Sequence, residues 1–572
     1  MASKPVISLL LTAHREGLVA HKTMLSLFDA AKPLGEQDAP YEILVHIDNG
    51  DDATSGYFAR YDNDPRISVF HNHFGDLGMS RNFLAQQARG TYVAFLDADD
   101  LVSPNWLVTA LDLLVASPDE VIVHPAAVLI FQHSGGSAPV LWLQNPSNDK
   151  WLDTQIMLGH NRWAAVYATT RELVCRLPYQ PTGKGIGYED WSFNTQTVAA
   201  GVRHAAAPDT VMFYRKRNNS LLQQSDQQHV LQPYCDLFDI MQINNHQPEA
   251  LPPSSDLAQV SRNRPLPLRI ASTMVRLVAR QPLLRRVVRR PYELLVRGRR
   301  LRQLRDRVPP YVVNAWAKMN AIERQLYPTL GTLFAVTQFQ PDDPTMGQIF
   351  QQLVRPLNTL PDYVFLVPCL APSDVIQALL NYLWALKQTR PDWAVAVIGT
   401  VPSLNDSAVE LPDDVSYLDF GNLTAGLADH ERDILMSRLI VQMRTTRWHI
   451  INSEEAYRWM SRHARYVTGH GYTVNVSVFP QTVAQPTDGP VDTEYDDPLL
   501  IDIYPLVNKI LTNSEAFAQE IVGRNGFASS RCIGHSMPTE ADRNESSDNG
   551  IWRRFVDEIR TDLDDSDPPR AK

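Results

Sequence analysis

The sequence predicts an α/β protein in which two domains are joined by a basic helical connector. Apolar runs of strand length alternate with stretches of helical periodicity near the N-terminus, and a second series of this kind begins near Tyr363. A segment rich in arginine and proline separates the two series. Such alternation is typical of parallel sheets, because each crossover helix returns the chain to the same edge of the sheet.

The length of 572 residues exceeds what a single hydrophobic core usually organises. The content of 44% hydrophobic and 9% aromatic residues is typical of a folded globular protein. We therefore predict a first domain over residues 1–245, a connector over 246–345 and a second domain over 346–540. Residues 541–572 are acidic, and we expect them to form a disordered tail.

Cysteine usage and hydropathy indicate where the protein resides. The four cysteines lie far apart with no CxxC pair, which favours buried thiols in a reducing compartment. The apolar stretch after the N-terminus is only about six residues long and predicts a first strand in place of a signal peptide. No window approaches the ~18 apolar residues of a membrane-spanning helix. We expect a soluble, cytoplasmic chain.

The first domain opens with a regular alternation of strands and helices. Helical periodicity covers residues 19–31 and 79–89, between apolar runs bounded by turn residues. The runs read VISLLL (6–11), YEILVHID (41–48) and TYVAFLD (91–97). Together they predict a mainly parallel sheet, and the pattern becomes less regular beyond about residue 142.

The connector carries a concentrated positive charge. Between Arg262 and Arg307 there are fifteen Arg, no Lys and two acidic residues, a net charge of +13 in a chain whose total is −11. Arginines around an apolar helix face suit an anionic membrane surface, here the inner membrane, where each basic residue contributes about 1 kcal/mol. A structural connector packed against acidic domains is the alternative. No readout motif accompanies the arginines, so we expect no nucleic-acid partner.

The second domain repeats the strand and helix alternation. Its predicted strands read YVFLV, WAVAVIG, VSYLDF, WHII and KILT. Two strand-to-helix junctions are alike, INSEEAYRWM (451–460) and LTNSEAFAQEI (511–521). In each we expect the serine to cap the helix and the following glutamate to favour the positive end of its dipole.

The stretch FLDADD, residues 95–100, ends a buried strand with three carboxylates, those of Asp97, Asp99 and Asp100. Ligands of parallel sheets bind at the carboxyl ends of strands. Clustered carboxylates repel one another unless a cation neutralises them, and Mg²⁺ or Mn²⁺ could do so while bridging to nucleotide phosphates. A loop in which these residues cap backbone amides is the alternative.

Residues 5 to about 225 resemble the family 2 glycosyltransferases, which have the GT-A fold. The resemblance rests on an ordered series of motifs, LTAHRE (11–16), HIDNGDD (46–52), GMSRNFLAQQARGTYVAFLDADDLVSPNWL (78–107) and GYEDWSF (187–193). It implies an inverting, metal-dependent transfer of a sugar from a nucleotide-diphospho sugar, a UDP-sugar above all. Mn²⁺ or Mg²⁺ is the implied cofactor.

The resemblance also implies roles for residues that hold the nucleotide. Thr12 and His14 match the loop after the first strand, where the His14 ring could stack on the base. Asp48 and Asn49 match the acidic pair that recognises the base edge, with Asn in the second position here. Arg81 matches an Arg-Asn step that approaches the nucleotide, with a salt bridge to nearby carboxylates as the alternative.

The remaining implied roles concern the cation and the chemistry. Asp99 matches the direct metal ligand of the DxD motif, and Asp97 lies nearer the ribose and shares the metal role. Asp100 orients the loop. Asp190 matches the base that takes a proton from the acceptor hydroxyl, and Glu189 orients substrate. A pair of ordinary N-terminal helix charges is the alternative for these last two residues.

The second domain resembles, more weakly, the N-terminal half of a family 4 (GT-B) glycosyltransferase, over about residues 345–535. For the whole chain we expect a glycosyltransferase of bacterial surface polysaccharide synthesis that uses a saccharide or lipid-linked acceptor, cytoplasmic and peripheral on the inner membrane. The alternative is a non-catalytic scaffold that binds nucleotide-sugar or membrane. The sequence of the two Rossmann-like domains does not determine which sugar is transferred or which linkage is formed.

Overall fold

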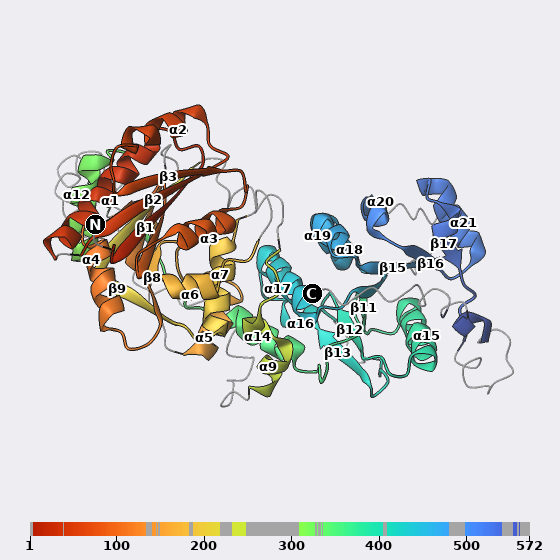
Figure 1. Ribbon diagram of the computed structural model, residues 1–572. Coiled ribbons are helices and arrows are strands. Elements are labelled where there is room, and N and C mark those ends of the chain that lie inside the picture. Colours follow the sequence, from red (N-terminus) through yellow and green to blue (C-terminus); the bar gives the residue numbers. More distant parts are fainter. Residues whose placement is uncertain are drawn as a thin grey trace, which may run out of the picture. The chain divides into compact units, whose positions relative to one another are not determined.

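The computed structural model describes two compact units of the chain (Figure 1). The first comprises Met1–Gln228 and Pro248–Asp343, and the second comprises His229–Gln247 and Pro344–Lys572. The described residues are 4–37, 39–132, 140–144, 146, 149–181, 187–217, 231–246, 308–326, 329, 333, 336–403, 409–479, 498–539, 553–557 and 560. The Arg-rich segment 262–307 lies outside them. Within these ranges, no helix is long and apolar enough to cross a membrane.

The first unit is built on a ten-stranded sheet in the order β10-β7-β6-β8-β4-β1-β2-β3, with β9 paired to β5 and β6. The strands are β1 (Ile7–Ala13), β2 (Tyr41–Asp48), β3 (Ile67–Asn72), β4 (Tyr92–Asp97), β5 (Leu101–Val102), β6 (Val121–Gln132), β7 (Val140–Leu143), β8 (Tyr167–Thr170), β9 (Arg203–Lys216) and β10 (Thr337–Phe339). Strands β3, β2, β1 and β4 are parallel, whereas β8 pairs antiparallel with β4 and β6. The expected parallel arrangement therefore holds for the strands that open the chain, within a mixed sheet.

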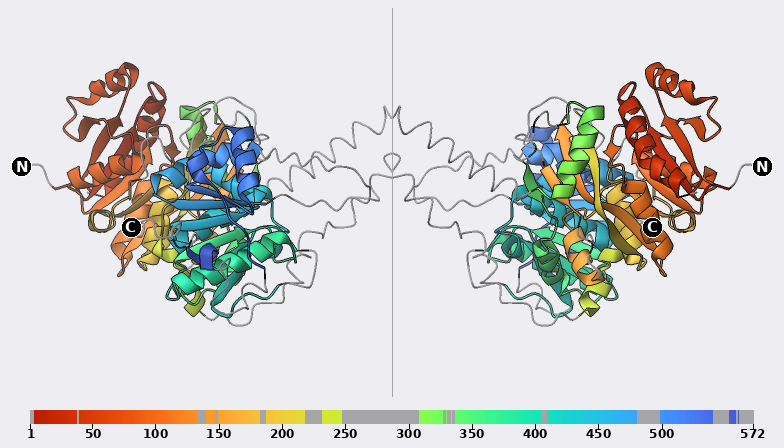
Figure 2. Two further views of the ribbon diagram at one scale, coloured as in Figure 1. Left: turned by 90° about the vertical axis from the view of Figure 1, so that its right-hand side faces the viewer. Right: turned by 90° about the vertical axis from the view of Figure 1, so that its left-hand side faces the viewer.

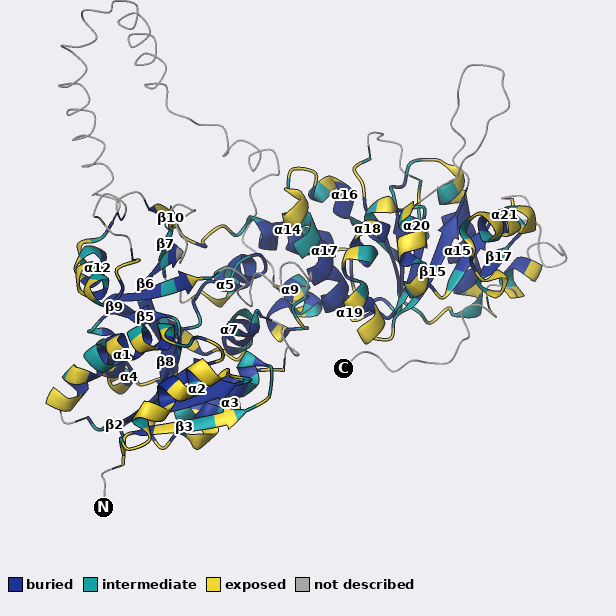
Figure 3. Ribbon diagram, turned by 90° about the horizontal axis from the view of Figure 1, so that it is seen from above, coloured by how far each residue is buried: buried dark blue, intermediate teal, exposed yellow. Residues whose placement is uncertain are grey.

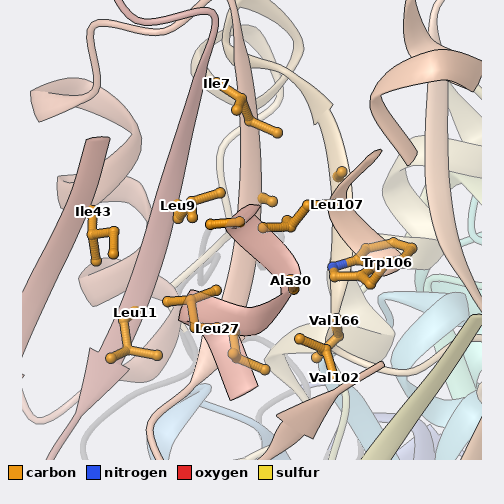
Figure 4. Close-up of a cluster of buried hydrophobic side chains, with 14 of the residues drawn as sticks. Ile7, Leu9, Leu11, Leu27, Ala30, Ile43, Val102, Trp106, Leu107 and Val166 are labelled. Carbon is orange, nitrogen blue, oxygen red and sulfur yellow. The ribbon is translucent and has the colours of Figure 1, made fainter. Parts of the chain in front are cut away.

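Helices cover both faces of this sheet, so the central strands are buried on either side. The helices are α1 (Val19–Glu36), α2 (Asp52–Phe58), α3 (Leu77–Gln87), α4 (Trp106–Ala116), α5 (Lys150–Met157), α6 (Arg171–Arg176), α7 (Glu189–Ala199) and α12 (Pro310–Ile322). All seven residues of β1 are buried. Leu9 and Leu11 join the core under α1 and α4 (Figure 4), while Leu10 joins a second core with Leu84 of α3. This alternation follows from the twofold period of a strand.

Part of the predicted connector belongs to the first unit. Helix α12 lies along β9 (Figure 2, right, green helix beside the yellow strand), and β10 extends the sheet by pairing parallel with β7. Glu323, after α12, is 1% exposed and forms ion pairs with Arg215 and Lys22, both at 2.8 Å. The described part of the segment predicted as a connector, from residue 308 on, therefore belongs to the first unit, whose range ends at Asp343. Val312, Ala315 and Met319 of α12 pack in one hydrophobic cluster with Val211 and Phe213 of β9, which explains why this segment packs on the sheet.

The second unit contains a seven-stranded sheet in the order β13-β12-β11-β14-β15-β16-β17, and every pair is parallel. The strands are β11 (Tyr363–Val367), β12 (Val395–Gly399), β13 (Val415–Asp419), β14 (Arg447–Ile451), β15 (Thr473–Val478), β16 (Lys509–Thr512) and β17 (Cys532–Gly534). Strand order reverses between β11 and β14, as in doubly wound Rossmann-like sheets. The expected second Rossmann-like domain is thereby confirmed.

Helices flank the second sheet, and its exposed residues lie on these helices and on the loops between the elements (Figure 3, yellow). They are α9 (Ile240–Asn245), α14 (Thr345–Val354), α15 (Asp374–Thr389), α16 (Phe420–Leu423), α17 (Asp429–Met443), α18 (Glu454–Arg462), α19 (Ala464–Gly469), α20 (Pro498–Ile503) and α21 (Glu515–Asn525). The predicted caps are confirmed, since Ser453 accepts from the amide of Ala456 and Ser514 from that of Phe517. In the predicted tail, residues 553–557 are helical and Phe555 is buried, in contrast to the expected disorder.

Candidate active site

Parallel strands bring several of the predicted residues to one edge of the first sheet. Thr12 of β1 is in register with Asp97 of β4, and β2 ends beside them at Asp48. The hydroxyl of Thr12 donates to Asp97 Oδ1. Residues from three separate stretches of sequence thus meet where the strands end, which is where ligands of such sheets bind.

Asp48 organises the loop that leads into α3. Its two carboxylate oxygens accept from the amide of Gly75 at 3.1 and 2.8 Å, and Ser80 Oγ lies 3.4 Å from Oδ2. Asn49 adopts a positive φ of 51° and its side-chain oxygen lies 3.0 Å from His73 Nδ1. Both predicted base-edge residues therefore lie at this edge, held in place by the β3–α3 loop.

His14 lies on the exposed rim of the same edge. Its Nδ1 contacts the carbonyl oxygen of Asp48, which orients the ring, while the residue as a whole is exposed. A planar ring held by one edge leaves its faces open, as stacking on a base requires. Gly50 permits the two loops to approach closely, because a Cβ there would lie 2.2 Å from Ile47 Cγ2 and 3.1 Å from the His14 carbonyl oxygen.

The three carboxylates of FLDADD have three different environments. Asp97 accepts from the Arg81 guanidinium at 3.0 and 3.1 Å. Asp99 forms an ion pair with Arg217 at 2.7 Å. Asp100 is 1% exposed, and one of its oxygens accepts from the amide of Arg215 at 2.8 Å. Asp100 therefore ties the loop to β9, whereas the side chains of Asp97 and Asp99 are 24% and 14% exposed.

Burial changes how these carboxylates titrate. It raises the pKa of Asp99 to about 6, with Arg217 opposing the shift. Burial, reinforced by the neighbouring Asp99 and Asp97 charges, raises the pKa of Asp100 well above its ordinary range. A carboxylate in low-dielectric surroundings favours its neutral form unless a cation is close. The cluster therefore favours positive charge beside Asp99.

Arg81 links the two halves of the candidate site. Its side chain is 1% exposed and bonds Glu189 Oε1 at 2.6 Å through one nitrogen and Asp97 through another. It also lies 5.5 Å from the centre of the Tyr179 ring. The salt bridge to nearby carboxylates, which the sequence offered as the alternative for Arg81, is thus present, and it holds Asp97 beside the helix of Glu189. The nucleotide contact of Arg81 stays a prediction.

Glu189 and Asp190 begin helix α7, after Tyr188 in a left-handed conformation with φ of 68°. Asp190 Oδ1 accepts from the amide of Trp191 at 2.8 Å, and Oδ2 accepts from Asn161 Nδ2 at 3.1 Å. Burial and the adjacent Glu189 carboxylate raise the pKa of Asp190 to about 7. A carboxylate with a pKa near neutrality has the properties required of a general base at physiological pH.

Sequence reasoning missed Asn161 and the partners of Arg217. Asn161 also accepts from Asn194 Nδ2 at 3.0 Å, so a chain of amides leads to Asp190. It lies in the irregular region where no periodic pattern marks it. Arg217 bonds Glu16 at 3.0 Å in addition to Asp99. The only sequence signal for Arg217 is that it lies in a run of basic residues.

The carboxylates of Asp97 and Asp99 are the candidate ligands of the predicted cation. Carboxylate oxygens are the donors that Mg²⁺ and Mn²⁺ prefer, and one or two suffice when diphosphate oxygens complete the shell. Asp99 fits, because its carboxylate is 14% exposed and already binds a cation, the Arg217 guanidinium. Asp97 has both oxygens bonded to Arg81. Among the residues the structure describes, no group of three or more His, Cys, Asp or Glu could hold a metal by itself.

Residues 8–164 match the family model described as "Glycosyl transferase family 2". The N-terminal region therefore resembles these enzymes. The matched range contains Asp48, Arg81, Asp97 and Asp99, and it ends before Asp190. The predicted likeness of the second unit to a family 4 enzyme stays a prediction.

Individual relatives are similar over limited ranges. A stretch of 62 residues is 39% identical to the uncharacterized protein y4gI of Sinorhizobium fredii, which is 11% of this chain and 7% of that protein. The crystal structure of S. aureus TarS 1-349 shares 18% identity at a TM-score of 0.30, over 36% of this chain and 60% of that one. The same protein in complex with UDP-GlcNAc shares 15% identity at 0.33, over 61% and 87%. These low scores transfer no residue roles.

Proposed function

We propose that the first unit is an inverting glycosyltransferase that moves a sugar from a nucleotide-diphospho sugar, with UDP as carrier, to an acceptor hydroxyl. The observation that carries the proposal is the Arg81 bridge. It joins Asp97, at the strand end where a nucleotide would bind, to the carboxylate pair that begins α7. The family match over residues 8–164 supports the same reaction class.

The donor would lie along the ends of β1, β2 and β4. The exposed His14 ring offers a face for the base, and Thr12, Asp48 and Asn49 surround it. Asp99 would hold Mn²⁺ or Mg²⁺, with Asp97 behind it. When bound, such an ion would offset the charge of the departing diphosphate. Arg217 is a second cation at this position and can move from Asp99 to a phosphate oxygen.

Asp190 would act as the base. Its Oδ2, oriented by Asn161, takes the proton of the acceptor hydroxyl as the acceptor oxygen attacks the anomeric carbon. The new C–O bond forms on the face opposite to the bond between that carbon and the diphosphate oxygen, which breaks. The electron pair leaves with the nucleoside diphosphate. A single displacement of this kind inverts the anomeric configuration.

Glu189 and Arg81 would support this step without exchanging protons. Glu189 is buried, and its ion pair with Arg81 keeps negative charge beside Asp190. That charge favours the protonated form of Asp190 and so strengthens it as a base. Removal of Arg81 would leave the buried carboxylate of Glu189 and the partly exposed carboxylate of Asp97 without their shared counterion.

The acceptor and the location of the protein are inferred from its sequence. We infer an acceptor that is a saccharide or lipid-linked chain in bacterial surface polysaccharide synthesis, and a peripheral location on the inner membrane through residues 262–307. The second unit is proposed to bind the acceptor or a partner. A non-catalytic scaffold is the competing function, and the experiment below separates the two.

The test is calorimetric binding of UDP to the full chain with Mn²⁺, with EDTA and with Asp99→Ala, followed by release of UDP from a set of UDP-sugars. We expect affinity to require both the metal and Asp99. Glu455→Ala, a carboxylate change in the second unit, is the matched control and should leave UDP binding unchanged. Binding of neither UDP nor GDP would overturn the proposal, and binding without turnover on a broad acceptor set would favour the scaffold.

A further inference from the structure

An exposed aromatic side chain lies in the same unit as the candidate base. Phe339 of β10 is 39% exposed, the most exposed among the described Phe, Tyr and Trp residues of the first unit. An exposed aromatic ring in a functional region is a common contact for ligands, because it offers a large rigid apolar surface.

Two further rings surround Phe339. Trp142 of β7 is its register partner, and the ring centres are 6.0 Å apart at an angle of 66°. The His160 ring lies 6.4 Å away at 79°. All three are at least partly exposed. The side chain of His160 has no hydrogen-bond partner in the described part of the chain, so its nitrogens are available to a ligand. We refer to these three residues as the aromatic platform.

The aromatic platform is tied to the base through the end of α5. His160 directly precedes Asn161, whose amide nitrogen lies 3.1 Å from Asp190 Oδ2. Trp191 adds a second link, since its indole nitrogen donates to the carbonyl oxygen of Met157 at 2.9 Å. Figure 3 shows α5 near α7 and β10 beside β7, in agreement with the contacts between these elements. His160 of the aromatic platform is therefore adjacent in sequence to Asn161, the residue that orients Asp190.

The chemistry of the platform selects a class of acceptor. A pyranose ring has a flat face of C–H groups and a rim of hydroxyls, so it packs on an aromatic face while its hydroxyls bond nearby polar groups. Phe339 supplies the apolar face and His160 a hydrogen-bonding group. A lipid chain would need a continuous apolar groove, whereas the neighbours of Phe339 on β10, Thr337 and Gln338, are polar and exposed.

We propose that Trp142, His160 and Phe339 bind a sugar ring of a saccharide acceptor and present its hydroxyl to Asp190. The identity of the ligand as an acceptor rests on the proposed function, whereas saccharide binding by the platform does not. In this arrangement β10, which follows the segment 262–307 in the sequence, completes the acceptor side of a site whose donor side lies within the first hundred residues.

The test is saturation-transfer NMR of the full chain with Mg²⁺, UDP and a panel of pyranose disaccharides: cellobiose, maltose, lactose and chitobiose. We expect at least one disaccharide to bind, with transfer strongest to the protons of one ring face. Phe339→Ala and Phe339→Leu should weaken this binding about fivefold or more, the size of a lost aromatic contact. Phe339→Trp should retain it. The Phe339→Leu variant separates apolar area from ring shape, because leucine keeps apolar area but has no flat ring face.

Controls separate this inference from the proposed function. Trp384→Ala removes an aromatic residue of the second unit that is 48% exposed, and it should leave disaccharide binding unchanged. UDP binding and thermal melting should be the same in Phe339→Ala and in the unaltered chain. Failure of all disaccharides to bind, or equal binding by Phe339→Ala, overturns the inference even if UDP binds. Disaccharide binding that depends on Phe339 sustains it even if UDP does not.

Binding to phospholipid vesicles tests the competing ligand, which is a lipid surface. If Phe339→Ala reduces sedimentation with anionic phospholipid vesicles and no disaccharide binds, the exposed ring serves a lipid surface and the saccharide inference is overturned. If vesicle binding is unchanged and disaccharide binding falls, the saccharide inference stands.

Discussion

Both units end a row of buried parallel strands with polar side chains, yet these side chains engage different partners. In the second unit, Asp419 at the end of β13 accepts from the amide of Asn422, three residues away. Asn452 after β14 exchanges two hydrogen bonds with the backbone of Phe479. These polar groups satisfy nearby backbone, and nothing in the described strand ends of this unit leaves a carboxylate paired with a buried cation.

The first unit uses its strand ends differently. Asp97 is bonded to Arg81 of α3, and Asp99 to Arg217, which lies 118 positions further along the chain. Asp190 and its partner Asn161 come from two further segments. Charges drawn from distant segments and desolvated together are typical of sites that bind or react, whereas local caps are typical of structure. The same edge of a parallel sheet thus holds local caps in one unit and, in the other, the long-range charge pairs on which the proposed chemistry rests.

The largest effect should come from the base. We expect Asp190→Asn to lower the rate of sugar transfer by about 10²–10⁴, the usual contribution of a general base, with UDP affinity unchanged. The measurement is UDP release and UDP calorimetry on the same preparation. Asp419→Asn is the matched change at a strand end of the second unit and should leave the rate as it is. A rate loss of equal size in both variants would erase the distinction between the units.

Arg81→Ala should have the next largest effect. It leaves the buried carboxylate of Glu189 and the partly exposed carboxylate of Asp97 without their counterion, and removing one partner of a buried ion pair typically costs about 3–5 kcal/mol of stability. Denaturant unfolding of the full chain, followed by a probe in the first unit, measures the change.

A control for Arg81 exists in the second unit. Arg432 lies 3.6 Å from Glu455 and donates to the carbonyl oxygen of Thr400 at 3.3 Å. Because the Glu455 side chain is 32% exposed and can be solvated, Arg432→Ala should cost less, about 1–2 kcal/mol. Arg81→Lys should restore only part of the stability, because a single ammonium cannot bond both carboxylates in the geometry of a guanidinium. Equal costs for Arg81→Ala and Arg432→Ala would contradict the assigned role.

The pH dependence of transfer sharpens the comparison further. Asp190 accepts a proton only when ionised, and its pKa of about 7 predicts a rate that rises as pH increases through neutrality. Asn161→Ala removes a hydrogen bond that favours the ionised form, so the pKa of Asp190 should rise. A hydrogen bond to a charged group corresponds to roughly one pH unit. The rise in rate should therefore move to higher pH by about that amount.

Asn452→Ala is the matched amide change for this experiment. Its amide bonds only backbone of the second unit in the contacts described above, so the profile should keep its midpoint even if stability falls. A midpoint that stays in place for Asn161→Ala would show that the amide does not act on Asp190.

The smallest effect should come from a helix cap. Ser514 accepts from the amide of Phe517 at the start of α21, and Ser514→Ala should cost about 1 kcal/mol of unfolding free energy. Ser514→Thr should recover most of it. UDP binding should be the same in all three proteins, and a change in UDP affinity would mean that the caps of the second unit are coupled to the nucleotide.

The sequence by itself determined features that depend on neighbouring residues. Strands β1, β2 and β4 of the first sheet and β11–β14 and β16 of the second follow from short apolar runs. The caps at Ser453 and Ser514 follow from Asn-Ser before a helical pattern. The carboxylates of Asp97 and Asp99 were predictable at a strand tip, because a run of buried residues ends directly before them. These features are local, so a window of ten residues contains their cause.

Only the tertiary structure decided which distant groups meet. It placed Arg81 between Asp97 and Glu189, set Asn161 against Asp190 and brought β10 into the first sheet. No pattern in sequence marks these contacts, because each joins segments whose separation is set by sheet register and chain crossings. Their energies depend on burial, and burial exists only once the sheets and helices have packed.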